Sequence, residues 1–468
     1  MELGSSPNRR RDTLFYVAAC GISLFPSHKA EAVSGVSGAG LNNFQQISVP
    51  NTVSESISVT AGREFSFALT GNGSVVGWGH PGENRAKPPA NLSGVIALSA
   101  GSYHTLALKS DGTVTGWGFN GNAILDIPSD LGNVLAIAAG GYHSLALRKD
   151  GTVVGWGFNR DGRTVPPTDL RDIVAIDAGR DHSVALKDDG TVVAWGLNDL
   201  HQTDVPAGLT NVVAIAAGEN HTLALKDDGT VVAWGLNEKG QTALPAGLTG
   251  VVAIAAGAQH SMALKSNGAA QGWGDNSKGQ LNFTGSDIRG VAAGGYHSLA
   301  LRSTGPLITS QPRGRASTAG GTVTFSATAT GSDLTYQWQL NGRDIDGATG
   351  STLSISDIGR TNAGVYTVKV SNSGGVAVSQ NSALIVHGRI RPASPQRLGS
   401  GALRLTFSDE FGDPLTNDAI TRYTVEVSED LQAWVPLNRV CAINNGRLQV
   451  DDPEAMQFSR RFYRLVNK

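Results

Sequence analysis

The chain has 468 residues, of which 60 are glycine, and its formal net charge is −2. This length predicts two or more domains and is ample for well-buried cores. Acidic and basic residues are interspersed, so the composition argues against a nucleic-acid partner and against a polybasic membrane-binding surface. After the first 32 residues, no apolar run approaches the length of a transmembrane helix.

The first 32 residues have the pattern of an export signal. Three arginines at 9–11 precede an apolar run from Leu14 to Phe25, and Ala30-Glu31-Ala32 has the small-x-small form of a cleavage site. We therefore predict a signal peptide over residues 1–32, cleaved after Ala32, and a secreted or cell-surface protein. Two variants stay open, namely a twin-arginine signal and a lipoprotein attached through Cys20.

Residues 33–305 consist of one repeated unit. The copy at residues 211–235 reads NVVAIAAGENHTLALKDDGTVVAWG, and its last tryptophan recurs every 39 residues, at Trp78, Trp117, Trp156, Trp195, Trp234 and Trp273. A period this strict indicates a repeat architecture.

Each unit reads as short strands separated by turns. VVAIAAG, HTLAL and TVVAWG are three apolar, β-rich segments, and a weaker segment runs on to Val-Pro-Ala-Gly. Asp228-Gly229 lies between two of these segments and is a strong hairpin signal, because glycine accepts the positive φ of a tight turn. Four short antiparallel strands in about 40 residues are typical of one blade of a β-propeller.

The two ends of the repeat region are each incomplete. The seventh copy stops near Gly305 without its TVVAWG strand, whereas residues 36–62 align without a gap on residues 192–218. An open fan of blades would expose strand edges to aggregation. We therefore predict an all-β, seven-bladed propeller that is closed when the N-terminal strands complete the last blade.

The unit AGxxHSxALxxDGxVxxWGxNxxGQ resembles the repeat of the regulator of chromosome condensation family, in the short form seen in secreted bacterial propellers. The resemblance covers roughly residues 36–305 and implies the fold more than the function. One member that it is similar to, the second β-lactamase inhibitory protein, binds an enzyme through one face of its ring. The eukaryotic founder acts in nucleotide exchange through a wedge between blades, for which the spacing here leaves no room.

The recurring polar side chains have a structural explanation. Histidine recurs at one position, as His104, His143, His182, His221, His260 and His297. In a sevenfold ring such neighbours stand about 8 to 10 Å apart, too far for a shared zinc ion, whose ligand nitrogens lie at about 2 Å. We expect each imidazole to bond to the backbone near a turn and the tryptophans to pack between blades. Asp181-His182-Ser183 contains the residue types of a catalytic triad, but they recur from blade to blade, so we expect no enzyme, metal or cofactor.

The copies differ most in the AGxx turns and in the turns after Trp-Gly, which antiparallel blades place on one face. A constant framework with varied loops is typical of a binding surface, and tyrosine and arginine anchor interfaces. Neutral variation at exposed turns is the alternative explanation. The candidate partner-binding residues are Arg63, Glu64, Tyr103, Phe119, Tyr142, Phe158, Arg180, Asp181, Glu219, Asn220 and Tyr296.

Residues 306–388 resemble an immunoglobulin-like sandwich. Trp338 takes the place of the core tryptophan, and Tyr366 that of the tyrosine at the corner before the second cysteine position. The resemblance implies a cysteine pair at positions that here hold Ala327 and Val368, so we expect a core without a disulfide.

Residues 389–468 predict a small C-terminal β-sandwich, similar to a fibronectin type III domain, with Trp434 and Tyr463 in its core. Its acidic loop at residues 409–413 leaves two interpretations open, a calcium site or a solvated turn. With Cys20 removed, Cys441 stands alone and no internal disulfide can form.

The combined prediction is an exported, non-enzymatic binding protein. In the first hypothesis the varied face captures a protein of unknown identity. In the alternative, a cell-surface or adhesive protein binds polysaccharide or matrix, with the sandwich domains as spacers or anchor. A patch around Tyr103, Tyr142 and Tyr296 with a charged rim would favour the first hypothesis, and a groove of stacked aromatics with amides the second.

Overall fold

The computed structural model describes residues 34–53, 56–168, 170–415, 419–420 and 423–467. Strands dominate these residues, which also include four 3-10 turns, η1 (Gly82–Asn84), η2 (Gly121–Ala123), η3 (Arg360–Asn362) and η4 (Ala455–Gln457), and two helical residues at 419–420. Within this part of the chain, no helix is long and apolar enough to cross a membrane. The predicted signal peptide and Cys20 lie outside the described residues.

Seven three-stranded antiparallel sheets, here called the repeat sheets, are built from β1 to β21. Six of them are formed by consecutive strands: β2 (Ser56–Ala61), β3 (Phe65–Thr70) and β4 (Val75–Gly79); β5 (Val95–Ala100), β6 (His104–Lys109) and β7 (Val114–Gly118); β8 (Val134–Ala139), β9 (His143–Arg148) and β10 (Val153–Gly157); β11 (Ile173–Ala178), β12 (His182–Lys187) and β13 (Val192–Gly196); β14 (Val212–Ala217), β15 (His221–Lys226) and β16 (Val231–Gly235); β17 (Val251–Ala256), β18 (His260–Lys265) and β19 (Ala270–Gly274).

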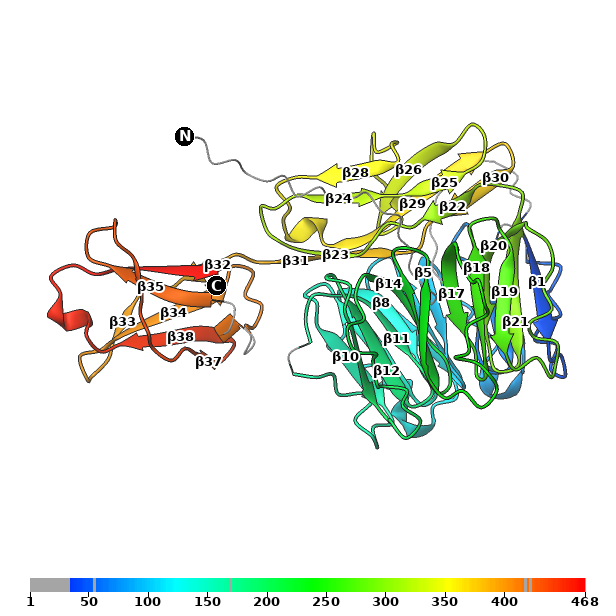
Figure 1. Ribbon diagram of the computed structural model, residues 1–468, viewed down its shortest axis with the longest axis horizontal. Coiled ribbons are helices and arrows are strands. Elements are labelled where there is room, and N and C mark those ends of the chain that lie inside the picture. Colours follow the sequence, from blue (N-terminus) through cyan, green and yellow to red (C-terminus); the bar gives the residue numbers. More distant parts are fainter. Residues whose placement is uncertain (1–33, 54–55, 169, 416–418, 421–422, 468) are drawn as a thin grey trace.

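The seventh repeat sheet joins the two ends of the repeat region. It contains β20 (Ile288–Ala293), β21 (His297–Ser303) and β1 (Ser34–Gly40). β1 pairs antiparallel with β21 along its whole length, from Ser34 opposite Ser303 to Gly40 opposite His297 (Figure 1). The N-terminal strand therefore takes the place of the TVVAWG strand that the last copy lacks.

The hairpins follow the turn chemistry of the sequence. Gly229 has a φ of 79°, and the Asp228 carboxylate accepts hydrogen bonds from the backbone N–H of Thr230 at 2.9 Å and from its hydroxyl at 2.6 Å. The same pair of bonds recurs at the three other Asp-Gly-Thr turns, which begin at Asp111, Asp150 and Asp189. An aspartate thus closes the turn that the following glycine makes possible.

The predicted fourth strand of each unit is not a strand. The segment before the next sheet, such as residues 198–211, forms turns and irregular backbone. Its proline has no N–H to give to a ladder, and side chains hold the segment instead. The Gln202 carbonyl accepts hydrogen bonds from Trp234 Nε1 at 3.0 Å and from the Thr222 hydroxyl at 3.3 Å.

The recurring histidines connect neighbouring repeat sheets. His182 Nε2 lies 3.0 Å from the Thr222 hydroxyl of the next sheet, and the equivalent distances from the other five histidines are 2.8 to 2.9 Å. Because the Thr222 hydroxyl gives its proton to the Gln202 carbonyl, Nε2 carries the proton and donates. The expected structural role holds, but the partner is a side chain of the next sheet rather than nearby backbone.

In five of the AGxx turns the glycine makes room for this histidine. A Cβ on Gly179 would overlap both the His182 ring and the Gly218 carbonyl of the neighbouring sheet. The small residue therefore allows neighbouring sheets to approach closely at this point.

Residues 307–387 form a second unit, here called the middle unit. Its strands are β22 (Leu307–Ser310), β23 (Arg315–Thr318), β24 (Val323–Ser326), β25 (Thr328–Thr330), β26 (Thr335–Leu340), β27 (Arg343–Asp344), β28 (Thr352–Ile355), β29 (Gly364–Asn372), β30 (Gly375–Val378) and β31 (Ser382–His387). A sheet with the order β23-β31-β29-β26-β27 faces the pairs β22-β25 and β24-β28. Trp338 is fully buried, Ala327 and Val368 are buried beside it, and the Tyr366 hydroxyl donates to the Asn362 carbonyl at 2.8 Å.

Residues 390–467 form the C-terminal unit, with two sheets. Its strands are β32 (Ile390–Pro392), β33 (Gln396–Arg397), β34 (Leu403–Asp409), β35 (Tyr423–Ser428), β36 (Val435–Pro436), β37 (Ala442–Asn444), β38 (Arg447–Asp452) and β39 (Phe462–Asn467). Tyr463 packs against the core, as predicted, and so does Cys441. The prediction for Trp434 is wrong, because its half-buried ring lies outside the core cluster and under the Arg464 guanidinium, 4.3 Å from it.

The middle unit packs on the face of the repeat sheets that carries the Asp-Gly turns (Figure 1). Val365, Ala383 and Ile385 share a buried apolar cluster with residues of β8 to β12. At the margin, His387 Nε2 lies 3.0 Å from Asp172 Oδ1, and Arg315 lies 3.6 Å from Asp188. The middle unit and the repeat sheets therefore share a packed interface and are not separated by a flexible linker.

Two threonines at the same repeat position test the histidine link. Thr222 accepts from His182, whereas the buried hydroxyl of Thr105 has no partner among the described residues, because Phe65 replaces histidine in the preceding sheet. We expect Thr222→Val to lower the free energy of unfolding by about 1 to 3 kcal/mol, since it leaves a buried N–H unpaired. Thr105→Val should cost less than about 0.5 kcal/mol. Urea unfolding of both variants measures this, and equal losses would contradict the link.

Stability should fall steeply in mild acid. Burial lowers the pKa of five of these histidines to about 3 or 4 and that of His143 well below its usual value. In the unfolded chain their pKa is about 6.5. The contribution of these neutral histidines to the free energy of unfolding is therefore complete above pH 6.5 and is lost as the pH falls from 6.5 toward 4. For six groups, the free energy of unfolding should fall with a limiting slope of about 8 kcal/mol per pH unit. Urea midpoints between pH 7.5 and 4.5 check this, and His260→Asn should remove about one sixth of the slope.

Candidate functional site

The varied loops lie together on the face opposite the Asp-Gly turns, here called the loop face. In each repeat sheet, the residue after Trp-Gly donates its backbone N–H to the carbonyl of the AGxx turn. Phe119 donates to Tyr103 at 3.0 Å, and Phe158 donates to Tyr142 at 2.8 Å. The same bond recurs in the other sheets and places Glu64, Asp181, Asn220 and Tyr296 on this face. The prediction that the two sets of turns share one face is confirmed.

Three of the predicted aromatic residues form a cluster. The rings of Tyr103 and Tyr142 lie 4.9 Å apart, and those of Tyr103 and Phe119 lie 6.1 Å apart. The Arg85 guanidinium stacks over the Tyr103 ring, 4.8 Å from its centroid. All three rings are half-buried, so they present fixed aromatic edges rather than mobile side chains.

Three charged residues meet where the AGxx turns surround a small opening. Arg63, Arg180 and Glu219 line this opening, which has a volume of about 80 Å³. Arg180 Nη1 donates to Glu219 Oε1 at 2.7 Å, and Arg63 Nη1 lies 3.8 Å from the same oxygen. Glu219 is largely covered, whereas 43% of the Arg180 side chain is exposed. The two arginines thus share one carboxylate and leave N–H donors toward solvent.

Asp181 and Phe158 belong to a third group around Arg163. The Arg163 side chain is buried and pairs with both Asp161 and Asp181, and its guanidinium lies 5.1 Å from the Phe158 ring. Asp181 also lies 3.4 Å from Arg180 Nε, which joins this group to the opening. Tyr296 lies on the same face but makes no ring contact with the aromatic cluster in the described part of the chain.

The Tyr142 hydroxyl stays protonated throughout the physiological range. A hydrogen bond with Tyr103, followed by partial burial, raises the pKa of Tyr142 above its usual value, and the nearby Arg180 and Arg63 only partly oppose this. The hydroxyl is therefore available as a hydrogen-bond donor and acceptor beside a cationic rim.

The residue types of a catalytic triad do not assemble. His182 bonds to Thr222, Asp181 pairs with arginines, and Ser183 donates to the Arg163 carbonyl at 2.8 Å. The acidic loop of the C-terminal unit is also engaged, because Glu410 accepts from Arg391 at 3.0 Å and Asp413 pairs with Arg360. These pairs favour the solvated-turn interpretation over a calcium site.

The comparisons with known proteins agree with this architecture. Six stretches match the model of the Regulator of chromosome condensation (RCC1) repeat, namely residues 57–85, 95–123, 134–163, 173–202, 212–241 and 251–280. Residues 306–372 match the model of an immunoglobulin domain. The chain carries regulator of chromosome condensation repeats followed by an immunoglobulin domain. The middle unit is therefore this immunoglobulin domain, and the sequence resemblance is confirmed at both places.

Similar solved structures add little beyond this. The ectodomain of the receptor kinase CR4 from Physcomitrella patens is 20% identical, with a TM-score of 0.43, over 50% of this chain and 67% of that one. Titin M4 is 21% identical, with a TM-score of 0.17, over 18% of this chain and 97% of that one. No curated protein matches the chain. At these scores the likenesses carry no argument about function.

Two arginines of the loop face were missed by sequence reasoning. Arg85 stacks on Tyr103, and Arg163 is buried among acidic and aromatic loop residues. Both stand at the repeat position that holds glutamine in four other copies, as at Gln202 and Gln241. That departure from the repeat was the available signal.

The loop residues should be replaceable without loss of the fold. We expect Arg180→Ala and Tyr142→Ala each to change the free energy of unfolding by less than about 1.5 kcal/mol, because exposed ion pairs and single ring contacts contribute about that much or less. Trp156→Ala, which removes a buried ring bonded to the Ile124 carbonyl at 3.0 Å, should cost about 3 to 5 kcal/mol. Urea unfolding compares the three, and a loop variant as damaging as Trp156→Ala would refute the distinction.

Proposed function

We propose that the seven repeat sheets form a closed, seven-bladed propeller whose loop face binds a protein partner. Closure is supported by the contacts between the last and first sheets. His297 Nε2 lies 2.9 Å from the Ser66 hydroxyl, which donates to the Gln46 carbonyl at 2.8 Å, as at the internal interfaces. Gly295 also donates its N–H to the Arg63 carbonyl at 3.1 Å.

The observation that carries the binding proposal is the difference between the two faces. The immunoglobulin domain is packed on the Asp-Gly face through a buried apolar cluster. The opposite face keeps the residues that vary between copies, with the tyrosine pair beside a rim of Arg63 and Arg180. Tyrosine and arginine are the residue types that most often anchor protein interfaces.

The alternative is a surface or adhesive protein that binds polysaccharide or matrix. A polysaccharide groove would need a row of stacked rings with amides. Here the rings form one compact cluster with a charged rim, which favours a protein partner. The packed immunoglobulin domain also fits poorly with a purely spacing role. We further propose that the protein is exported, cleaved after Ala32 and without enzymatic activity.

Capture of a partner by the full-length protein tests the proposal. We expect Tyr142→Ala and Arg180→Ala to weaken binding of a partner isolated from culture medium or cell envelope by 10-fold or more, since hot-spot residues contribute at least about 1.4 kcal/mol. Arg343→Ala, which removes an exposed arginine of the immunoglobulin domain, is the matched control and should leave binding unchanged.

Biolayer interferometry with the captured partner gives the affinities. A partner that binds wild type, Tyr142→Ala and Arg180→Ala equally would exclude the loop face. Competition by soluble polysaccharide, with protein capture unaffected by these substitutions, would favour the alternative.

A further inference from the structure

The repeat sheets enclose a central cavity of about 160 Å³. Each sheet contributes one alanine from the end of its inner strand to the wall: Ala61, Ala100, Ala139, Ala178, Ala217, Ala256 and Ala293. The same alanines line the opening on the loop face. The cavity and the opening therefore meet at the same set of alanines.

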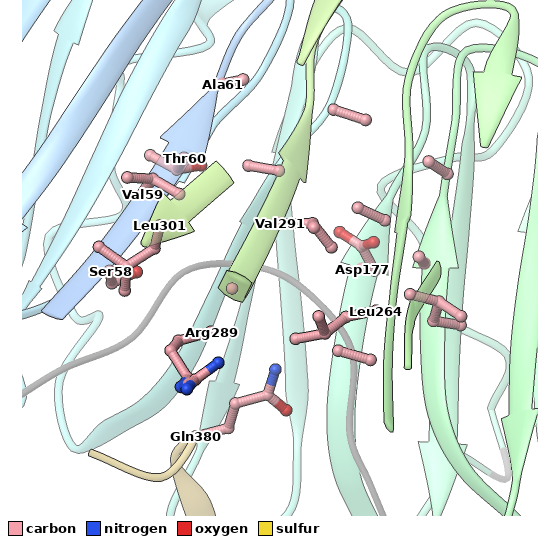
Figure 2. A pocket seen from close by; sticks show the side chains of 18 of the residues that line it. Ser58, Val59, Thr60, Ala61, Asp177, Leu264, Arg289, Val291, Leu301 and Gln380 are labelled. Carbon is pink, nitrogen blue, oxygen red and sulfur yellow. The ribbon is translucent and has the colours of Figure 1, made fainter. Parts of the chain in front are cut away.

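The immunoglobulin domain covers the other end of the cavity. Ile308, Gln311, Val378 and Gln380 line it there, together with Arg289 of β20 (Figure 2). A Cβ on Gly268, in the turn of the neighbouring sheet, would come within 3.0 Å of Arg289 Nη1, which places the guanidinium at the Asp-Gly face. The floor of the cavity is thus shared between the last repeat sheet and the immunoglobulin domain.

Arg289 stands where the other six repeat sheets have an aliphatic residue. The second residue of the inner strand is Ile57, Ile96, Leu135, Val174, Val213 or Val252 in the other copies. The fold therefore does not require arginine at this position, and the charge is specific to the last sheet.

The charge of Arg289 has no carboxylate partner among the described residues. Its Nε donates to the Gly305 carbonyl at 3.2 Å, and Nη1 donates to the carbonyls of Ile288 and Ser286 at 3.1 and 3.4 Å. Asp287 pairs with Arg302 and only partly offsets the burial that lowers the pKa of Arg289. These bonds leave the two N–H groups of Nη2 available, and a half-buried guanidinium without a counter-ion is costly unless an anion joins it.

Gln380 supplies a second unsatisfied group at the same end of the cavity. Its Oε1 is buried and has no hydrogen-bond partner within the part of the chain that the structure describes. Figure 2 shows the Gln380 amide and the Arg289 guanidinium on the same side of the cavity, apart from Asp177. Both Asp177 oxygens accept backbone N–H groups, from Ala178 at 2.9 Å and Ala217 at 2.8 Å, so this carboxylate is already engaged.

We propose that the floor of the cavity binds a small free hydroxycarboxylate. The carboxylate accepts from Arg289 Nη2, and the hydroxyl donates to Gln380 Oε1. A guanidinium is the side chain best suited to a planar carboxylate. Arg63 and Arg180, which both lie close to the Glu219 carboxylate, line the opening on the loop face. An opening of about 80 Å³ admits a small anion more readily than the side chain of a partner protein.

Calorimetric titration of the full-length protein with glycolate tests the proposal, at constant ionic strength set by sodium chloride. We expect saturable binding by wild type and at least 10-fold weaker binding by Arg289→Leu, which places at this position the residue that Leu135 already holds in another sheet. Arg397→Gln removes one exposed positive charge from the C-terminal unit and should bind as wild type does.

Acetate and a second variant separate the two contacts. Acetate should bind wild type several-fold more weakly than glycolate, and Gln380→Leu should remove that difference. Absence of saturable glycolate binding by wild type, or its retention by Arg289→Leu, would overturn the site. Equal binding of acetate and glycolate would overturn the role of Gln380.

This site is independent of the loop-face proposal. Arg289→Leu should leave partner capture unchanged, and Tyr142→Ala should leave glycolate binding unchanged. Failure of one proposal is therefore distinguishable from failure of the other.

Discussion

The architecture of the repeat sheets depends on one polar link between neighbours. A neutral histidine donates to a hydroxyl of the next sheet, the hydroxyl donates to a backbone carbonyl, and a tryptophan N–H joins the same carbonyl, as at His182, Thr222 and Trp234. The link satisfies buried polar groups that water cannot reach. It also holds the outer segment of each unit, which has no ladder of its own. The glycine near five of the histidines follows from the same constraint, because a larger side chain would occupy the place of the ring.

The two faces of the repeat sheets differ because the immunoglobulin domain, which follows them in the chain, covers only one of them. After β21 the polypeptide leaves on the Asp-Gly side, and the immunoglobulin domain folds back onto that side through Ile385 and its neighbours. The loops of the other side stay uncovered, and they carry the residues in which the copies differ. Asymmetry between the faces thus comes from the order of the domains along the chain, not from the repeat itself.

Much of the fold could be predicted from the sequence because the same pattern of strands and turns recurs in successive copies of the repeat. The strands, the Asp-Gly hairpins and the pairing of the N-terminal segment with the last copy all follow from it, and Trp338 and Tyr366 identified the immunoglobulin core. The prediction of a fourth strand was wrong because the proline of this segment lacks an N–H for a ladder, and hydrogen bonds from side chains hold the segment in an irregular conformation instead. Trp434 was misplaced because a tryptophan in a strand-rich segment can also cover a surface arginine. The docking of the immunoglobulin domain, and with it the setting of Arg289, depends on contacts between distant segments that no local pattern encodes.

The position of β1 has a consequence for the order of assembly. Six repeat sheets are each made from neighbouring segments, but Gly40 must find His297, 257 residues further along the chain. Contacts at such separation form late, because the entropy lost in closing a long loop must be repaid first. During synthesis β1 therefore stays unpaired until β21 has been made, after the strands of the six other repeat sheets. The last repeat sheet is completed when β1 pairs with β21, and a chain interrupted before β21 would leave β1 without its partner strand.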